Sequence, residues 1–590
     1  MNNRLLLTTA VYPFPSLPQN EAATDVMGQR FTRGNDLFTM VSHTHPCGLH
    51  LLAQNLEIPS VVLEYPRWNQ FCREVARGYE VIGISAYPFH LDTVFRMCRH
   101  IRMVSPSTRI LVGSYAAQTL MALGGLEKFG DMIDEIVDGE GVGHLRRHFG
   151  EDPSRPVLQR FFPRNGAGLR YLGKQPKGNT VLLFSGLGCP GGCDFCSSSA
   201  MYKRKRIELL SPQSVVEHVS HYLERLPGGV TQFYLIDEDY FRFPDYLLEM
   251  RRHIADHPEL IEQADFVVFG SVDYIARFAS TYGWEAIAEA GVGVIFIGVE
   301  SRNAGENGYG KRDRADAREV FAKLHNLGIR TIGAWIAGFP FQSRETLQED
   351  LDYYISCYPT YQQLSIFSAF PGTPLHEARS NESKEPDCQF ADYHFWNPSS
   401  THPDYSNSEL LELTEHGYEL GYQRWGACLL RNLDVHLNGV EWCEQSESPL
   451  LSNHAILLHR KNAAKLYTQL RTMEKYAPNQ EVLKRIRSLT SRYHSIFGAA
   501  TLLQETASWG SLLLATLYTW KCKISPWSPK TEGFRRFIYT PGAAAPDGSP
   551  YVIDRLASLD TTYSLKRLIP KVFGRLAALV VSVYLTKQKI

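Results

Sequence analysis

The sequence predicts an α/β protein in which two parallel sheets are followed by a helical region. Apolar runs of strand length recur between residues 4 and 141 and again between 181 and 367, and stretches with helical spacing separate them. Such alternation is typical of parallel sheets. After Pro374 the strand-like runs give way to long helical stretches. A length of 590 residues suits two to four domains.

Residues 1–150 are expected to form a doubly wound, flavodoxin-like (Rossmann-like) domain. Its strand candidates are nearly continuous apolar runs, as in strands buried on both faces: residues 4–12, 60–65, 79–87, 109–113 and 134–137. Sheets of this kind bind ligands beyond the carboxyl ends of their strands. Gly113, Ser114 and Gly139 lie at those ends and are candidate ligand contacts, with plain turns as the alternative interpretation.

A linker and a second α/β unit follow. Residues 151–178 are rich in proline and glycine and are assigned to the linker. Residues 179–380 contain six strand–helix units, which predict a partial (β/α)6 barrel. The strand candidates are residues 181–184, 232–236, 266–269, 292–298, 331–336 and 364–367.

Residues 381–590 are expected to be mainly helical, with helices over residues 408–432, 455–476 and 480–493. Residues 496–520 carry a single charge, Glu505, but polar residues interrupt this apolar run. We therefore predict a buried helix or hairpin there and not a membrane span. Residues 561–590 hold six basic residues and no acid. Two readings stay open for them: a basic amphipathic helix on an anionic membrane surface, and a helix docked on its own domain.

The composition excludes several classes of protein. The chain has 61 Lys and Arg residues and 62 Asp and Glu residues, so it has no net positive charge that would attract nucleic acid. Eleven cysteines are too few for a disulfide scaffold, and the first residues lack the layout of a secretory signal. We therefore expect a cytoplasmic protein with reduced cysteines.

Three cysteines carry the strongest chemical signal in the chain. Cys189, Cys193 and Cys196 follow a predicted strand at C-x3-C-x2-C spacing, so their thiolates can converge on one metal centre. Soft sulfur ligands select zinc or an iron–sulfur cluster. A structural zinc site normally has four ligands, and no cysteine lies between Cys196 and Cys357. A [4Fe–4S] cluster held by three thiolates instead keeps one iron open for substrate.

This loop resembles the CxxxCxxC signature of the radical S-adenosylmethionine (radical SAM) superfamily. The resemblance includes Phe195, the aromatic residue before the last cysteine, and the position of the loop after the first strand of a six-unit array. It implies a [4Fe–4S] cluster on Cys189, Cys193 and Cys196, which would be both the metal ligands and the catalytic centre, with SAM on the open iron and Phe195 beside it.

The second and third strands extend the resemblance. Asp237 matches the acidic position near the methionine amino group of SAM, while its neighbours Glu238 and Asp239 are expected to be solvated. Ser271, near the end of the third strand, is a further candidate contact to SAM. Ordinary barrel packing remains the alternative for each segment taken alone.

The fourth and fifth strands match in the same order. Glu300 and Ser301 would approach the SAM ribose or carboxylate, and Ile336 and Gly338 belong to the segment that would cradle the adenine. The shared order of these segments favours the functional interpretation.

Residues 1–150 resemble the cobalamin-binding domain that precedes this core in many radical SAM enzymes, and the PGTPL turn at 371–375 is similar to the same group. The resemblance implies a corrinoid at the sheet edge that holds Gly113, Ser114 and Gly139. Families that hold cobalt through a lower histidine carry DxHxxG, whereas this chain keeps only H-x-x-G, at His45. His45 is thus a candidate cobalt ligand, with a loop or helix-cap histidine as the alternative.

The resemblance covers about residues 1–380 and implies reductive cleavage of SAM at a [4Fe–4S] cluster and hydrogen abstraction from an unactivated carbon. Cobalamin-dependent C-methyl transfer is the first hypothesis. The second is a radical SAM cyclase, oxidase or carbon–carbon coupling enzyme in which the corrinoid is absent or has another role. The third is a metal-binding protein without catalysis.

These hypotheses imply particular partners. A small-molecule or lipid-like substrate is expected, together with a low-potential electron donor such as a flavodoxin or ferredoxin and no nucleic acid. The basic residues 561–590 would allow peripheral contact with a membrane.

Overall fold

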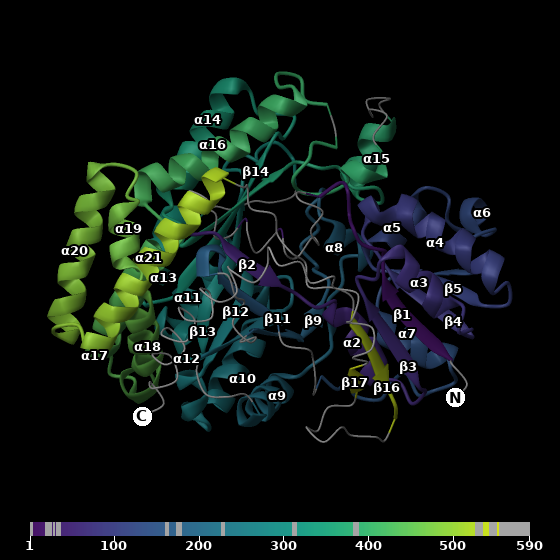
Figure 1. The fold of residues 1–590 in the computed structure, drawn as a ribbon, viewed down its shortest axis with the longest axis horizontal. Helices are drawn as coiled ribbons and strands as arrows, with labels where there is room; N and C mark the ends of the chain where they lie inside the picture. Colours follow the sequence, from purple (N-terminus) through teal and green to yellow (C-terminus); the bar gives the residue numbers. More distant parts are fainter. Residues whose placement is uncertain are drawn as a thin grey trace.

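The computed structural model describes residues 4–17, 26, 30, 37–159, 165–172, 180–225, 230–309, 315–381, 389–399, 401–524, 535–541 and 551–553. Two α/β units stand side by side in it, and a helical region lies at the far end of the second unit (Figure 1). The predicted α/β fold class is confirmed.

The first sheet has the order β17-β16-β3-β1-β4-β5-β6 among the described residues. Its chain-initial strands run parallel: β1 (Leu5–Thr9), β3 (Ser60–Glu64), β4 (Val81–Ser85), β5 (Arg109–Gly113) and β6 (Glu135–Ile136). Every residue of β1 and β3 is buried, because helices cover both faces. These helices are α2 (Cys47–Gln54), α3 (Trp68–Val75), α4 (Leu91–Val104), α5 (Tyr115–Ala122), α6 (Gly125–Phe129) and α7 (Gly141–His148).

Two strands from the end of the chain complete this sheet. β16 (Arg535–Tyr539) pairs antiparallel with β3, and β17 (Tyr551–Ile553) pairs with β16. In addition, β7 (Gly166–Leu169), inside the predicted linker, pairs with β2 (Met40–His43). The domain limits at 150, 178 and 380 stay predictions, while the pairing shows that the chain returns to its first sheet after the helical region.

The second sheet consists of six parallel strands in chain order within the described part of the chain: β8 (Thr180–Phe184), β11 (Thr231–Ile236), β12 (Ala264–Ser271), β13 (Val292–Glu300), β14 (Arg330–Ala337) and β15 (Tyr361–Ile366). The sheet curls into a half-barrel (Figure 1). Helices that follow the strands include α9 (Pro212–Arg225), α10 (Pro244–Ala255), α11 (Val272–Tyr282), α12 (Glu285–Glu289), α13 (Ala317–Asn326), α14 (Arg344–Ser356) and α15 (Pro374–Asn381). The predicted strands all fall at these positions.

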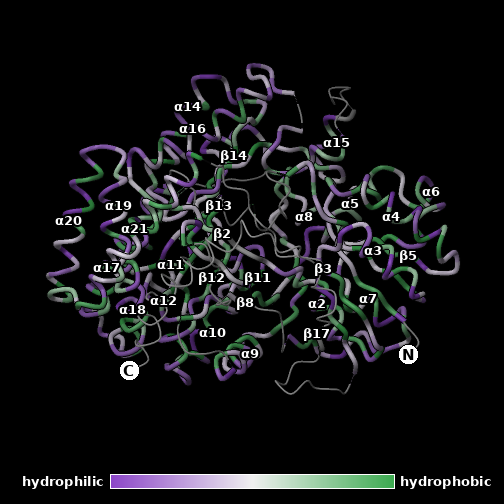
Figure 2. The backbone as a smooth tube through the Cα atoms, in the orientation of Figure 1, coloured by the Kyte–Doolittle hydropathy of each residue, from purple (hydrophilic) through white to green (hydrophobic). Residues whose placement is uncertain are grey.

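The helical region differs from the expected division in two places. The predicted helix over 408–432 is two helices, because α16 (Asn407–Trp425) ends at Gly426 in a left-handed conformation (φ +81°) and α17 (Cys428–Gln445) begins afterwards. Residues 455–476 likewise split into α18 (Ile456–Tyr467) and α19 (Leu470–Lys475). The outer helices alternate between hydrophilic and hydrophobic positions (Figure 2), as helices with one buried face do.

Helices α20 (Gln480–Phe497) and α21 (Leu502–Ile524) end the helical region. The expectation of a buried helix or hairpin over 496–520 is half right: α21 is a helix, and Leu514 and Tyr518 pack against the core, but six other large apolar side chains are exposed. Within the described residues, no helix combines the length and the apolar character needed to cross a bilayer.

Candidate functional site

The cysteine loop starts directly after β8. The short strand β9 (Gly186–Leu187) pairs with β10 (Ile207–Glu208), and the helix α8 (Ser197–Met201) begins after Cys196. The Cys196 amide donates to the carbonyl oxygen of Cys193 (3.0 Å), and the Gly191 amide donates to the Cys189 sulfur (3.2 Å). All three thiols are free of disulfides. The loop is therefore held in shape by contacts between its own residues.

The pKa values of these thiols bear on how they could bind a metal centre. Burial raises the pKa of Cys189, although the Gly191 amide and the Arg242 guanidinium act against this rise, and burial raises the pKa of Cys196 to about 12. Both are thiols at neutral pH, so metal binding would release protons. Three sulfur ligands on one loop fit an iron–sulfur cluster.

Gly188 fixes the turn that leads into the loop. It has φ +79°, and a Cβ there would lie 2.4 Å from both the Lys205 carbonyl oxygen and the Tyr202 Cβ. We expect Gly188→Ala to lower the iron and sulfide content of the reconstituted protein severalfold, because backbone strain of about 1–3 kcal/mol adds to this overlap. Gly48→Ala is the matched control, since a Cβ at Gly48 meets no atom within 4 Å. Full iron content in the Gly188 variant would contradict the role of this turn.

A cavity of about 360 Å³ lies between the two sheets, and Cys196 forms part of its wall. The lining is largely aromatic and apolar, and it comes from both α/β units and from the segment after β15. The main residues are Tyr87, Phe89, Tyr115, Phe195, Ser198, Phe296, Glu300, Ile336, Gln363, Ser365, Phe367, Phe370, Tyr393 and Trp396. A chamber of this kind can enclose an organic ligand and exclude water next to the cysteine loop.

The two units touch directly at the loop. The hydroxyl of Tyr115, at the start of α5, lies 2.7 Å from the Ser198 hydroxyl. The Gln118 amide donates to the Gly372 carbonyl oxygen (3.0 Å). Within the second unit, the Leu375 amide donates to the carbonyl oxygen of Asp194 (3.1 Å), which ties the turn that Gln118 contacts to the cysteine loop. The carboxyl edge of the first sheet therefore faces the cysteine loop across the cavity.

Comparison with known families is decisive for the half-barrel. Residues 183–354 match the family model described as "Radical SAM superfamily". The chain contains a radical SAM domain.

Two curated relatives match parts of the chain. One is "Bacteriochlorophyllide d C-12(1)-methyltransferase" of Chlorobaculum tepidum, 24% identical over 35% of this chain and 44% of the relative. The other is "Uncharacterized methyltransferase PH0819" of Pyrococcus horikoshii, 23% identical over 42% of this chain and 55% of the relative. The chain thus spans about half the length of each curated relative that it matches.

Two solved structures overlap with parts of the chain. The methyltransferase TsrM from Kitasatospora setae, solved with cobalamin and a [4Fe–4S] cluster, overlaps with a TM-score of 0.47 at 15% identity, over 72% of this chain and 85% of TsrM. OxsB, solved with aqua-cobalamin and S-adenosylmethionine, overlaps with a TM-score of 0.46 at 12% identity, over 89% of this chain and 80% of OxsB.

Four of the site residues predicted in the radical SAM domain meet in the cavity wall: Phe195, Cys196, Glu300 and Ile336. Phe195 packs edge to face on Phe339, with ring centres 5.7 Å apart. Glu300, at the end of β13, has φ +57°, a conformation that non-glycine residues adopt at a cost. The geometry brings these residues together as the sequence order predicts, while their contacts with a cofactor stay predictions.

Three of the acidic and hydroxyl side chains near the ends of the neighbouring strands β11 and β12 form hydrogen bonds or ion pairs with other protein groups: Asp237, Asp239 and Ser271. Asp237 forms a buried ion pair with Arg206 (2.7 Å), and the Ser271 hydroxyl donates to the Asp239 carboxylate (2.9 Å). The expectation that Asp239 is solvated is wrong, because Asp239 is buried. Glu238 is also not freely solvated: burial raises the pKa of its carboxyl, against the hydrogen bond from Ser198.

The remaining predicted residues occupy turns. Ser301 is buried and its hydroxyl accepts from the Asn303 amide (3.3 Å), and the Gly338 amide donates to the Gln342 side chain (2.9 Å). In the first sheet, Gly113 ends β5, and Ser114 (φ +66°) and Gly139 (φ +111°) have positive φ angles in the loops that follow the strands. Roles for these five residues in cofactor binding stay predictions.

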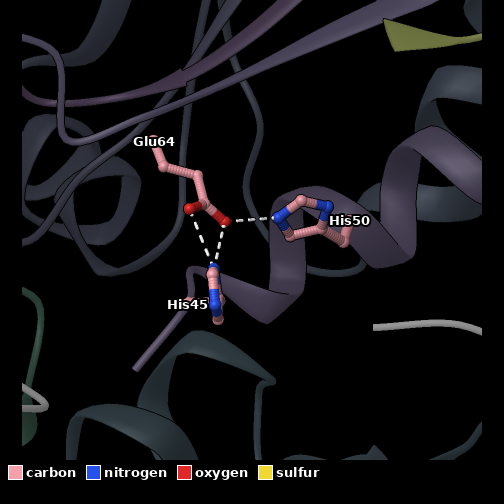
Figure 3. A group of neighbouring side chains, drawn as sticks. All are labelled: His45, His50 and Glu64. Atoms are coloured by element: carbon pink, nitrogen blue, oxygen red, sulfur yellow. Dashed lines mark hydrogen bonds and ion pairs between the residues drawn. The ribbon is translucent and has the colours of Figure 1, made fainter. Parts of the chain in front are cut away.

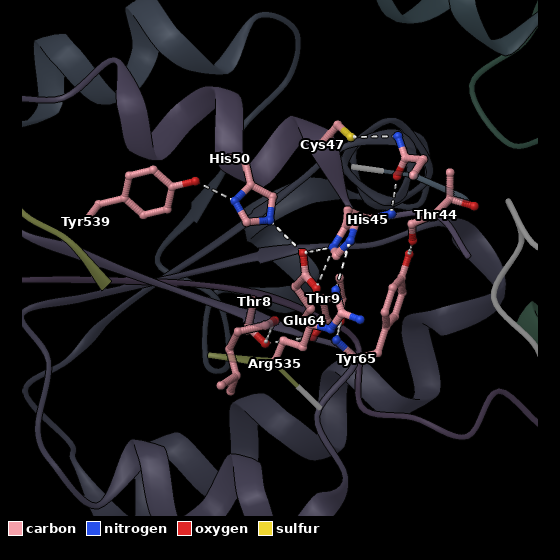
Figure 4. A network of polar contacts seen from close by, with 12 residues as sticks. Thr8, Thr9, Thr44, His45, Cys47, His50, Glu64, Tyr65, Arg535 and Tyr539 are labelled. Atoms are coloured by element: carbon pink, nitrogen blue, oxygen red, sulfur yellow. Dashed lines mark hydrogen bonds and ion pairs between the residues drawn. The ribbon is translucent and has the colours of Figure 1, made fainter. Parts of the chain in front are cut away.

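His45 belongs to a buried polar cluster at the end of β3 (Figure 3). Its Nδ1 lies 2.7 and 2.8 Å from the two Glu64 oxygens, and His50 Nε2 lies 2.6 Å from one of them. Arg535 approaches His45 Nε2 (3.2 Å), and the Tyr539 hydroxyl lies 2.5 Å from His50 Nδ1 (Figure 4). Arginine only donates, so His45 Nε2 accepts and its Nδ1–H donates to Glu64.

The same cluster has the residue types of a metal site. His45, His50 and Glu64 offer ligand atoms that lie within 4.8 Å of one another. The hydrogen bonds already use those atoms, and His45 is absent from the residues that line the cavity. The cluster therefore joins α2 and β3 to β16, whereas the role of His45 as a cobalt ligand stays a prediction.

The sequence analysis missed the aromatic residues of the first sheet that face the cavity. Tyr87 and Tyr115 each come within two residues of a strand end, and their rings stack at 6.0 Å and 11°. The side chain of Tyr87 is 36% exposed because it borders the cavity. The protein around the cavity still desolvates its hydroxyl, which raises the pKa of Tyr87. The sequence did contain a signal for Tyr87 and Tyr115: an aromatic residue just after a parallel strand lies at the sheet edge where ligands bind. Gln363 and Trp396 carried no such signal.

Proposed function

We propose that the protein is a cobalamin-dependent radical SAM methyltransferase that abstracts hydrogen from an unactivated carbon of its substrate. The carrying observation is the cavity that Cys196 shares with Tyr87 and Tyr115, since it puts the cysteine loop opposite the carboxyl edge of a Rossmann-like sheet. The names of both curated relatives, each a methyltransferase, support methyl transfer.

Residues on the two sides of the cavity would hold different cofactors. Cys189, Cys193 and Cys196 would ligate a [4Fe–4S] cluster, and Phe195, Glu300 and Ile336 would contact SAM beside it. Tyr87 and Phe89, whose rings stack at 5.7 Å and 2°, would form an apolar aromatic wall against a corrin ring.

The chemistry that these cofactors supply when bound is one-electron cleavage of SAM and delivery of a methyl group. The protein's own part is alignment and protection. The aromatic walls exclude water from the space beside Cys196, and the hydrogen bond between Tyr115 and Ser198 holds the first sheet against the loop at a fixed distance.

The substrate and the partners complete the proposal. An apolar, aromatic chamber suits a small-molecule or lipid-like substrate with a planar or apolar body, in line with the bacteriochlorophyllide in the name of one relative. A flavodoxin or ferredoxin would supply the electron, in a cytoplasmic setting. The predicted membrane contact through residues 561–590 lies outside the described residues.

Anaerobic purification and cluster reconstitution test the proposal. The expected results are a corrinoid absorption band that stays with the protein through gel filtration, and a spin-resonance signal of the reduced cluster that changes when SAM is added. Deoxyadenosine formation without a retained corrinoid would favour a cyclase, oxidase or coupling enzyme instead, and a product that gains one carbon distinguishes methyl transfer from these. One zinc and no labile sulfide would overturn radical SAM chemistry altogether.

A further inference from the structure

Helix α21 presents a stripe of large apolar side chains to solvent. The residues of this α21 stripe are between 44% and 85% exposed: Leu502, Trp509, Leu513, Leu517, Trp520 and Ile524. Their spacing of three, four or seven residues puts all six on one side of the helix. Soluble proteins rarely leave so many large apolar residues together on one surface element without a partner.

The orientation of α21 is fixed by polar contacts on its other side. The buried face consists of small or polar residues, namely Gln504, Ala507, Ser508, Ser511 and Ala515. The Ser511 hydroxyl donates to Gln469 (2.8 Å) and lies 2.9 Å from the Tyr171 hydroxyl, and Gln504 donates to the Tyr493 hydroxyl (2.9 Å). Rolling the helix to bury the stripe would break these buried hydrogen bonds, so the stripe stays outward.

Basic side chains border the stripe. The Arg471 guanidinium lies 4.6 Å from the centre of the Trp509 ring, Lys475 bonds Thr516 (3.1 Å), and Lys521 and Lys523 are exposed on the last turn. The acidic residue of the helix, Glu505, is paired with Arg471 (2.5 Å), so the net positive charge of this border comes from Lys475, Lys521 and Lys523. Apolar residues with tryptophans inside a basic border have the character of a helix that lies in the headgroup region of a bilayer.

We propose that the α21 stripe is a peripheral docking site for an anionic lipid surface, with the helix lying in the plane of the membrane. The basic border matches anionic headgroups. A symmetric contact with a second copy would bring the same basic residues toward one another, which disfavours that occupant. This proposal is independent of the proposed catalytic function, because neither α21 nor the basic residues beside it line the cavity.

Flotation of the purified full-length protein with vesicles tests the site. We expect binding to vesicles of phosphatidylcholine and phosphatidylglycerol, weaker binding as salt rises, and little binding to phosphatidylcholine alone. Leu513→Glu should lower the partition coefficient at least about tenfold, because it puts a charge where an apolar side chain would enter the bilayer. Lys521→Gln combined with Lys523→Gln should weaken binding only to the anionic vesicles.

The control is Leu126→Glu, which changes a similarly exposed leucine on α6 and should bind vesicles like the wild type. Circular dichroism checks that each variant is folded. The proposal would be overturned if the Leu513 variant floated like the wild type, or if the wild-type protein did not bind anionic vesicles. A wild-type dimer that the Leu513 variant converts to monomers, measured by light scattering, would assign the stripe to a second copy instead.

Discussion

Replacing Cys196 with alanine should abolish SAM cleavage. Cys196 is one of three cysteines on the loop and the one that lines the cavity, so its loss would take away a proposed cluster ligand at the point where substrate would approach. We expect iron and labile sulfide to fall well below the wild-type content after anaerobic reconstitution, and deoxyadenosine formation with reductant and SAM to fall to background. Both quantities are measured on the same preparation.

Cys72→Ala is the matched control, because Cys72 is also a partly buried free thiol but lies on α3, away from the loop. It should keep wild-type iron, sulfide and deoxyadenosine formation. A Cys196 variant that assembles a full cluster and cleaves SAM at the wild-type rate would show that the loop does not form the catalytic centre.

The half-barrel and its cysteine loop could be predicted because their signals are local. The strands of this sheet are apolar runs in chain order, and parallel pairing between consecutive strands needs no distant partner. The three cysteines and Phe195 lie within eight residues, so one loop carries the whole motif. The same holds for the central strands of the first sheet.

Features that depend on distant partners escaped prediction. Strand β16 pairs with β3, so that Arg535 lies opposite Glu64, 471 residues earlier in the chain. The sequence of residues 535–539 does not indicate which strand it will pair with. The inward orientation of Tyr87 and Trp396 depends on how the two units pack. For α21, the many apolar residues predicted a buried helix. Hydrogen bonds of Ser511 and Gln504 to distant residues determine which face of the helix is buried, and the sequence does not show them.

The buried cluster around Glu64 gives the second large expected effect. Glu64→Leu should lower the free energy of unfolding by about 2–6 kcal/mol, because it leaves the buried imidazole groups of His45 and His50 without their shared hydrogen-bond partner, at about 1–3 kcal/mol each. Urea unfolding at neutral pH, followed by circular dichroism, measures this difference. Glu127→Leu, on the exposed side of α6, is the control and should change stability by less than about 0.5 kcal/mol.

The pH dependence provides an independent check on the same cluster. Burial alone would raise the pKa of Glu64, but its interactions with His45 and His50 hold it well below the usual 4.5, so its stabilisation is full above pH 4.5 and is lost as pH falls through the folded-state value. Burial lowers the pKa of His50 from 6.5, so below pH 6.5 the unfolded chain binds a proton that the folded protein does not. Acid should therefore destabilise the wild type from about pH 6.5 downward and more steeply below 4.5. Glu64→Leu should lack the steeper part, since no carboxylate remains to be protonated at that position, and an unchanged profile in this variant would remove Glu64 as its source.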